Sequence, residues 1–266
     1  MPHLSFTRIW AILLRHLYLY PKSMSRIMEI FYWPVLDLLV WGFLTLYIDK
    51  NPGMINRFSG FLLGAMIFWD ILFRSQQAVS ISFIEEMWSR NLLNLFTSPL
   101  TPKEFLTATM ALSFVKLLTS GVVTIFLAWN FFSFNIFRMG LYLFPFVLNL
   151  VVMGWIIGIM TTGIVLRYGE RAEVMAWGLA LLLQPFSAVF YPVSILPGFL
   201  KPVALALPAT HVFEGMREVL LGNPLSLNQI LVPSFLNAIY LVLAFIFFHK
   251  MFESAREHGR LAKLGE

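Results

Sequence analysis

The sequence contains no cysteine, few charged residues and no nucleotide-binding loop. Without cysteine, the chain forms neither disulfides nor thiolate metal sites, and it has no cysteine nucleophile. Only 12% of the residues are charged, against about 25% in ordinary soluble domains, and 59% are hydrophobic. The mean hydropathy is +0.77, and several apolar stretches reach the roughly 20 residues that cross a bilayer. We therefore expect an integral membrane protein.

The absence of a phosphate-binding loop limits how such a protein can be powered. No G-x-x-x-x-G-K-[ST] motif is present, and no lysine follows a glycine-rich turn. If ATP is the fuel, we expect ATP and its Mg²⁺ to be bound by a partner, with no cofactor in this chain. The net charge of +5 does not indicate nucleic acid, because the basic residues lie at the ends of apolar runs.

Six apolar segments are each long enough to span a bilayer at about 1.5 Å per residue. They cover 27–48, 58–84, 107–134, 139–166, 174–191 and 230–252. We expect an all-α fold with six transmembrane helices in a single domain, 1–266, that ends in a cytoplasmic tail at 253–266. The pairs Gly60/Gly64 and Gly154/Gly158 lie inside the second and fourth segments and favour close helix packing.

Residues 1–22 predict an amphipathic helix that lies in the membrane interface. Phe6, Trp10, Leu13, Leu17 and Tyr20 share one side at helical spacing, with Arg8, Arg15 and Lys22 opposite, toward water and lipid phosphates. The alternative is an extension of the first span, which Pro21 disfavours. No small-residue cleavage site follows, so the pattern is not that of a signal peptide.

The distribution of Lys and Arg predicts the orientation. With both termini on one side, that side collects twelve basic residues against five on the other, so both termini are expected in the cytoplasm. The twelve are Arg8, Arg15, Lys22, Arg26, Arg90, Lys103, Arg167, Arg171, Lys250, Arg256, Arg260 and Lys263, and the five are Lys50, Arg57, Arg138, Lys201 and Arg217.

A polar and amphipathic loop at 85–104 interrupts the second and third apolar runs. Glu85 and Glu86 stand at the water boundary, and Pro99 ends a short helical stretch before Thr101-Pro102 begins the next helix. A helix held between two rigid spans can act as a lever for a docked partner, with Glu85, Glu86, Trp88, Arg90, Leu93, Phe96 and Pro99 as contacts. The alternative is an interfacial helix that rests on lipid headgroups.

The loop at 192–222, on the other side, is too apolar for a solvated connection, and several prolines divide it. Non-helical backbone at membrane depth survives only where protein or a water-filled cavity surrounds it, so we expect an outer re-entrant helical hairpin. The candidate residues of this outer gate are Pro192, Pro197, Pro208, His211, Glu214 and Arg217.

Two stretches resemble the type-2 permease family of ATP-binding-cassette exporters. They are RNLLNLFTSPL at 90–100, and YPVSILP with LPATHVFEGMRE within 191–218. The resemblance implies that 85–100 is the coupling helix on a cytoplasmic ATPase, and that 192–222 closes the exit. It also implies two ATPase copies and a second permease copy, which we expect to be identical, in a bacterial inner membrane.

Charged residues within spans are costly and are functional candidates by default. Asp70 and Arg74 are spaced i,i+4 and can form an ion pair on one helix face, which Asp37 can join. A structural ion pair and a role in substrate binding or gating both remain open, as does proton coupling. In polysaccharide exporters of the family, aromatic belts line the conduit, and the resemblance carries this role to Tyr32, Trp33, Phe190 and Tyr191.

These observations predict a permease that exports an amphiphilic substrate, either a lipid-linked glycan or a hydrophobic drug or lipid. The alternative is a polytopic membrane enzyme acting on lipid-linked sugars, with His211, Glu214 or Glu218 at its site. Those three residues share a helical spacing, but H-E-x-x-H is absent and a metal site is not expected. A secondary transporter would show a paired inverted repeat, which the sequence does not display.

Overall fold

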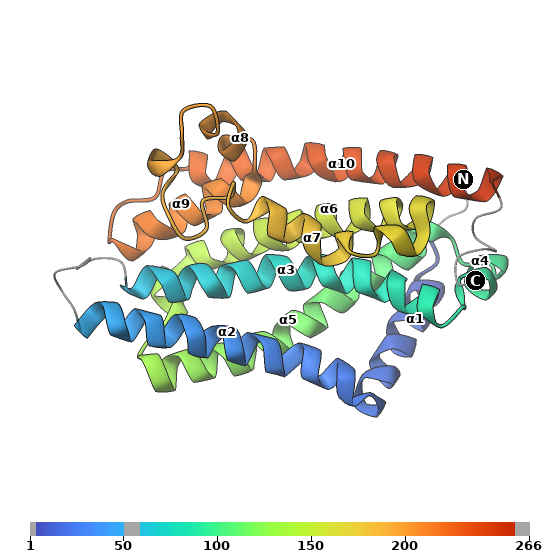
Figure 1. The fold of residues 1–266 in the computed structure, drawn as a ribbon, viewed down its shortest axis with the longest axis horizontal. Coiled ribbons are helices and arrows are strands. Elements are labelled where there is room, and N and C mark those ends of the chain that lie inside the picture. Colours follow the sequence, from blue (N-terminus) through green and yellow to red (C-terminus); the bar gives the residue numbers. More distant parts are fainter. Residues whose placement is uncertain (1–3, 51–58, 259–266) are drawn as a thin grey trace.

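The computed structural model describes residues 4–50 and 59–258, and these form an elongated bundle of helices (Figure 1). Five long helices make up the bundle: α2 (Met24–Lys50), α3 (Ser59–Trp88), α5 (Pro102–Phe132), α6 (Leu143–Tyr168) and α10 (Asn228–Glu257). Residues 1–3 and 259–266 of the expected terminal segments, together with Arg57, Arg260 and Lys263 of the charge count, lie outside the described residues.

Short elements cluster toward the two ends of the bundle (Figure 1). At one end lie α1 (Phe6–Leu19), the turn η1 (Tyr20–Lys22), α4 (Leu92–Thr97) and the end of α10. Toward the opposite end lie η2 (Ile136–Tyr142), η4 (Val193–Ile195), α8 (Lys201–Leu205) and α9 (Pro208–Leu220). The turn η3 (Gly169–Ala172) joins α6 to α7 (Met175–Leu183). We call these the α4 end and the α9 end.

Four helical stretches among the described residues are long and apolar enough to cross a membrane: Arg26–Ile48, Pro102–Phe132, Ile136–Ala172 and Asn228–Glu257. The 30-residue helix α3 also has the length, but it carries charged residues. The expected fifth span, 174–191, is helical only over the nine residues of α7. At about 1.5 Å per residue that helix covers less than half of a bilayer core, so six membrane-crossing helices are not confirmed.

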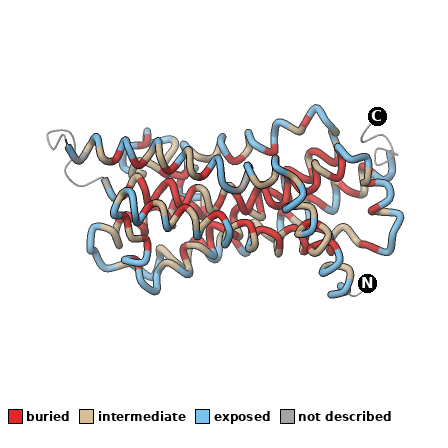
Figure 2. The backbone as a smooth tube through the Cα atoms, turned by 90° about the horizontal axis from the view of Figure 1, so that it is seen from below, coloured by how far each residue is buried: buried red, intermediate tan, exposed pale blue. Residues whose placement is uncertain are grey.

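The interior divides into two apolar clusters, and Figure 2 shows buried residues running along the middle of the bundle. One cluster joins α3, α6 and α9 around Phe68, Phe146 and Phe213. The other joins α1, α3, α4, α5 and α10 around Phe83, Phe105 and Phe252. Each end of the molecule therefore has its own packed core, and α3 and α6 run through both.

Glycines bring α3 and α6 into close contact. A Cβ atom on Gly154 would lie 2.5 Å from the carbonyl oxygen of Leu72, and one on Gly158 would lie 2.8 Å from that of Gln76. Close packing at Gly154 and Gly158 is thus confirmed, since no larger side chain fits against that backbone. Within the described part of the chain, a Cβ atom on Gly60 would meet nothing within 4 Å, whereas one on Gly64 would lie 3.2 Å from the Met216 sulfur, so of this pair only Gly64 is closely packed.

Candidate functional site

The connection between α3 and α5 forms a compact turn that presents α4 at the end of the bundle. Arg90 adopts a left-handed conformation with φ of 54°, and the amide of Asn91 donates to the carbonyl of Glu86 at 2.9 Å. This bonding closes the end of α3 in the manner of a helix C-cap. Pro99 follows α4, and Pro102 occupies the first turn of α5, as the sequence predicts.

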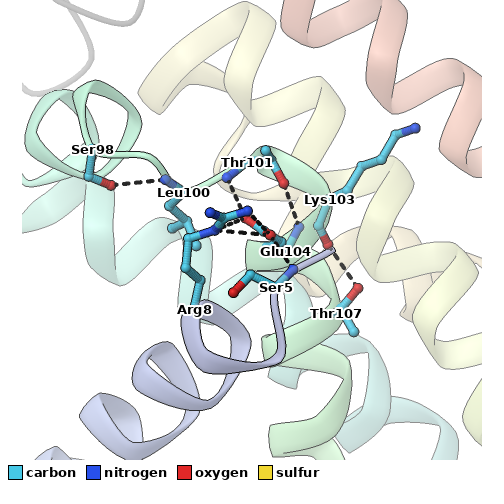
Figure 3. A network of polar contacts seen from close by, with 8 residues as sticks. All are labelled: Ser5, Arg8, Ser98, Leu100, Thr101, Lys103, Glu104 and Thr107. Atoms are coloured by element: carbon cyan, nitrogen blue, oxygen red, sulfur yellow. Dashed lines mark hydrogen bonds and ion pairs between the residues drawn. The ribbon is translucent and has the colours of Figure 1, made fainter. Parts of the chain in front are cut away.

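The first turn of α5 is fixed by Glu104, whose carboxylate Figure 3 shows among Ser5, Arg8 and Thr101. Thr101 and Glu104 form a capping box, in which each side chain accepts a hydrogen bond from the other's backbone amide. The Glu104 carboxylate also accepts from the Ser5 amide at 2.8 Å and from Arg8 Nη2 at 2.6 Å. Glu104 is fully buried, so this one carboxylate ties the start of α1 to the start of α5.

Two further ion pairs join the N-terminal region to the end of α3. Arg15 on α1 lies 2.8 Å from Glu86, which also accepts a hydrogen bond from the Asn91 side chain at 2.7 Å. Arg26 on α2 lies 2.9 Å from Glu85. We call the three pairs Arg8–Glu104, Arg15–Glu86 and Arg26–Glu85 the α1 clamp.

The α1 clamp corrects the expectation that Arg8 and Arg15 face water and lipid phosphates. The two side chains are only about one third exposed, at 34% and 37%, and they bind Glu104 in the first turn of α5 and Glu86 in the last turn of α3, on either side of the loop. The apolar residues Phe6 and Trp10 do remain exposed, and their rings stack on each other. α1 is therefore amphipathic as expected, but its basic residues brace the loop.

The expected coupling residues fall into two groups. Trp88, Arg90, Leu93 and Pro99 are exposed, whereas Glu86 is buried and Glu85 is partly exposed. Phe96 also turns inward, and its ring lies 6.4 Å from that of Phe105 and 5.3 Å from that of Phe252. Glu85, Glu86 and Phe96 thus hold the loop in place, while the other four form an outward face that we call the α4 face.

Sequence reasoning overlooked Glu104 and His16. The signal for Glu104 was present, because Thr101-Pro102-Lys103-Glu104 has the spacing of a capping box. His16 lies on the buried side of α1, and its Nε2 atom has no hydrogen-bond partner among the described residues. Burial, together with the charges of Arg15, Lys116 and Arg26, lowers the pKa of His16 to about 4. The imidazole is therefore neutral at physiological pH.

At the α9 end, the expected gate residues are mostly engaged in holding the backbone. Pro208 begins α9, Pro192 lies beside η4 and Pro197 is exposed. His211 Nε2 lies 2.8 Å from the carbonyl oxygen of Leu205, which fixes α8 against α9. α8 and α9 are the two short helices within 192–222; α9 packs against α3, α6 and α10, whereas α8 packs against α9 and η4.

Glu214 and Arg217 bind the non-helical segment that follows α7. Arg217 lies 2.7 Å from Glu214 and donates to the carbonyls of Ala188 and Val189. Glu214 in turn accepts a hydrogen bond from the Val193 amide at 2.8 Å. Ala188 has a φ of 52°, which is outside helical geometry. Glu214 and Arg217 therefore supply hydrogen-bond partners to backbone groups that a regular helix would pair internally. We call this arrangement the α9 clasp.

A cavity of about 610 Å³ opens beside the α9 clasp. Its walls come from α2, α3, the turn between α5 and η2, and α9. Glu214, Arg217 and Pro192 line it, as do Asn135 and Arg138, whereas His211 does not. Three of the six expected gate residues, Pro192, Glu214 and Arg217, thus line one cavity, and His211 stands apart from them.

The expected conduit aromatics form two separate groups. Tyr32 and Trp33 are exposed neighbours on α2, with ring centroids 5.5 Å apart. Phe190 stacks on Trp41 of α2 at 4.2 Å, and the Tyr191 hydroxyl donates to the carbonyl of Pro185. The structure therefore connects Phe190 to α2 through Trp41, a residue that sequence analysis did not select.

The charged residues expected within the spans lie on α2 and α3. Asp70 and Arg74 form the predicted i,i+4 ion pair at 2.8 Å. Asp37 is exposed on α2. It lies close enough to Asp70 and Arg74 to interact with both charges electrostatically. Among the described residues, no group of three or more His, Asp or Glu side chains converges on a common point.

The polar side chains proposed for a membrane enzyme have structural partners. His211 and Glu214 bind backbone groups, as described above, and Glu218 accepts a hydrogen bond from the Asn223 side chain at 2.7 Å. This bonding does not favour a catalytic site on α9.

Comparison with known proteins supplies the family. A family model described as ABC-2 type transporter matches residues 7–221. A comparison with curated proteins finds no match. Because the matched region covers most of the chain and its helices include membrane-crossing candidates, this multi-pass membrane protein belongs to the ABC-2 type transporter family, whose permeases normally pair with an ATP-binding-cassette ATPase.

Proposed function

We propose that this chain is the membrane permease of an exporter driven by a separate ATPase, and that the ATPase docks on the α4 face. One observation carries the proposal: Leu93 on the short helix α4, and Trp88, Arg90 and Pro99 in the segments on either side of it, are exposed, and the whole turn is braced from behind. The α1 clamp ties α1 and α2 to α3 and α5, the helices on either side of α4, and the Phe96 ring packs α4 against α5 and α10. A push on α4 would therefore move several long helices together.

The proposed membrane topology has six crossings, with both termini in the cytoplasm. The α4 end carries most of the basic residues and is placed in the cytoplasm of a bacterial inner membrane, with both termini there. α2, α3, α5, α6 and α10 provide five crossings. The sixth is α7 with its non-helical continuation to Val193, which is supported by the α9 clasp on the carbonyls of Ala188 and Val189.

The functional unit contains two copies of this chain and two ATPases, which bind ATP and Mg²⁺. Its cargo is an amphiphilic molecule that moves outward along aromatic surfaces that include Tyr32, Trp33, Phe190 and Tyr191. The segment 192–222 closes the exit, and the α9 clasp sets its position. Movement of α3 and α6 links the two ends, since their backbones touch at Gly154 and Gly158 and cannot slide freely.

Substitutions on the α4 face test the proposal. Arg90→Gly removes the side chain and suits the left-handed backbone, and Leu93→Ala removes an exposed apolar contact. Both variants are expected to fold and to lose transport in cells that express the natural ATPase. Thr97→Ala, an exposed position on the same helix, is the control. Full transport by Arg90→Gly and Leu93→Ala, alone and together, would contradict docking on this face.

A further inference from the structure

Asp37 stands at the middle of the candidate span Arg26–Ile48 and is exposed on the chain. α2 lies along one side of the bundle and packs against α3 and α5 (Figure 1), so its other side is uncovered. Asp37 shares that uncovered side with Trp33, Val40, Leu44 and Tyr47, all of which are exposed. The spacing of four and three residues places these five side chains on a single stripe of α2.

A charged side chain at the middle of a bilayer does not face lipid without a large cost, and such residues face protein or water. The stripe of α2 that contains Asp37 is therefore not a lipid-facing surface. A dry contact between two copies of α2 is also disfavoured, because a two-fold axis would bring the two Asp37 carboxylates toward each other. A water-filled space between the copies keeps Asp37 away from lipid, and it also keeps the two Asp37 carboxylates apart.

The charge at this level of the membrane is negative. Arg74 is held by Asp70 at 2.8 Å, and Asp37 adds a second carboxylate within range of both. Two tryptophans lie one helical turn from Asp37 along α2, since Trp33 precedes it by four residues and Trp41 follows it by four. Trp41 is backed by Phe190, whose ring stacks on it at 4.2 Å. Aromatic faces attract organic cations at water-exposed sites as well as at buried ones.

We propose that Trp33, Asp37 and Trp41 form a binding site for an amphiphilic organic cation, and that such cations are the cargo class of this permease. The inference rests on the proposed function, because it takes the uncovered stripe of α2 as a wall of the transport pathway. The Asp37 carboxylate selects for positively charged ligands. The indole rings of Trp33 and Trp41 offer an apolar surface that binds a ligand without requiring one fixed orientation. A polyanionic glycan would meet the Asp37 carboxylate at mid-membrane and is disfavoured.

Two probes of the same size and opposite charge test the site: tetraphenylphosphonium and tetraphenylborate. Binding of each is measured by equilibrium dialysis on the full chain in nanodiscs of phosphatidylcholine, with empty nanodiscs as the baseline. We expect Asp37→Asn to weaken tetraphenylphosphonium binding about tenfold and to leave tetraphenylborate binding unchanged or tighter. Asp37→Glu should retain the preference for the cation. Glu170→Gln, which removes an exposed carboxylate on η3, should match the unmodified chain.

Equal binding of tetraphenylphosphonium to the unmodified chain and to Asp37→Asn would overturn the proposal. So would an equal loss of both probes, which would indicate a general loss of structure. If Asp37→Asn does not fold, the unmodified chain decides: binding of tetraphenylborate as tight as that of tetraphenylphosphonium contradicts a cation site. The measurement needs no ATPase, so it fails or succeeds independently of docking on the α4 face.

Discussion

The two ends of the molecule are held together by different kinds of bond. At the α4 end, carboxylates bind guanidinium groups from segments 59 to 96 residues away, and side chain meets side chain. At the α9 end, Glu214 and Arg217 bind backbone amide and carbonyl groups of a segment that is not helical. The α1 clamp therefore joins regular helices into one unit, whereas the α9 clasp maintains an irregular segment that regular hydrogen bonding cannot hold.

This difference has a mechanical meaning. A unit of rigid helices transmits a displacement, which suits the end where a motor docks. An irregular segment held by one arginine changes its shape when that arginine is withdrawn, which suits the end where a pathway opens. The sharing of α3 and α6 by both apolar cores supplies the connection between the ends.

Removal of Arg217 should produce the largest effect. Arg217→Ala leaves the carbonyls of Ala188 and Val189 and the Glu214 carboxylate without their donor in a buried site, and we expect a loss of about 3–5 kcal/mol in unfolding free energy. Thermal unfolding in detergent, followed by size-exclusion chromatography, measures it. Glu218→Gln, on the same helix, should change stability by less than about 0.5 kcal/mol. If the two variants were equally stable, the α9 clasp would contribute no more to stability than Glu218 on the same helix, which would contradict the account.

Acidification should release the α4 end and leave the α9 end in place. His16 has a folded pKa of about 4 against an ordinary value of 6.5, so the detached α1 binds the proton more tightly. The contact of α1 with the bundle is fully stable above pH 6.5. It weakens as the pH falls from 6.5 to about 4, by at most about 3 kcal/mol.

The mobility of a spin label at an exposed position of α1, introduced as Ala11→Cys, reports this release. The natural chain has no cysteine, so the label is unique. The mobility should increase as the pH falls through this range, and His16→Leu should suppress the increase. A pH response that persists in His16→Leu would assign the effect to other groups.

Double-mutant cycles on the α1 clamp give the smallest effects and sharpen the comparison. Glu104 is buried and accepts hydrogen bonds from Ser5, Arg8 and Thr101, whereas Glu85 and Arg26 are both partly exposed. We expect a coupling energy of about 1–2 kcal/mol for Arg8–Glu104 and below about 1 kcal/mol for Arg26–Glu85. The reverse order, measured by thermal unfolding in detergent, would show that burial does not set the strength of the clamp.

Local patterns in the sequence predicted the local structure. The ion pair of Asp70 and Arg74 follows from i,i+4 spacing, and the start of α5 follows from Thr101-Pro102. The early end of α7 was also readable, because Pro185 has no amide hydrogen to donate to the helical hydrogen-bond ladder, and the apolar length of 174–191 concealed this signal.

Long-range pairings were not readable from one sequence. Nothing in the spacing of Arg8, Arg15 and Arg26 selects Glu104, Glu86 and Glu85 as partners, because those contacts depend on how α1 packs against α5. The same limit applies to Arg217, whose acceptors are the backbone carbonyls of a broken helix. Charge and amphipathicity identified the two ends of the molecule, and the tertiary packing determined what each charge does there.

Site-specific cross-linking tests docking on the α4 face most directly. In the cysteine-free chain, Leu93→Cys is treated with a maleimide–succinimide cross-linker in membranes that contain the natural ATPase, and Phe137→Cys at the opposite end is the control. The account predicts a covalent adduct between the Leu93→Cys chain and the ATPase, and none from Phe137→Cys. An adduct from Phe137→Cys alone, or no adduct from Leu93→Cys in membranes that still transport, would contradict it.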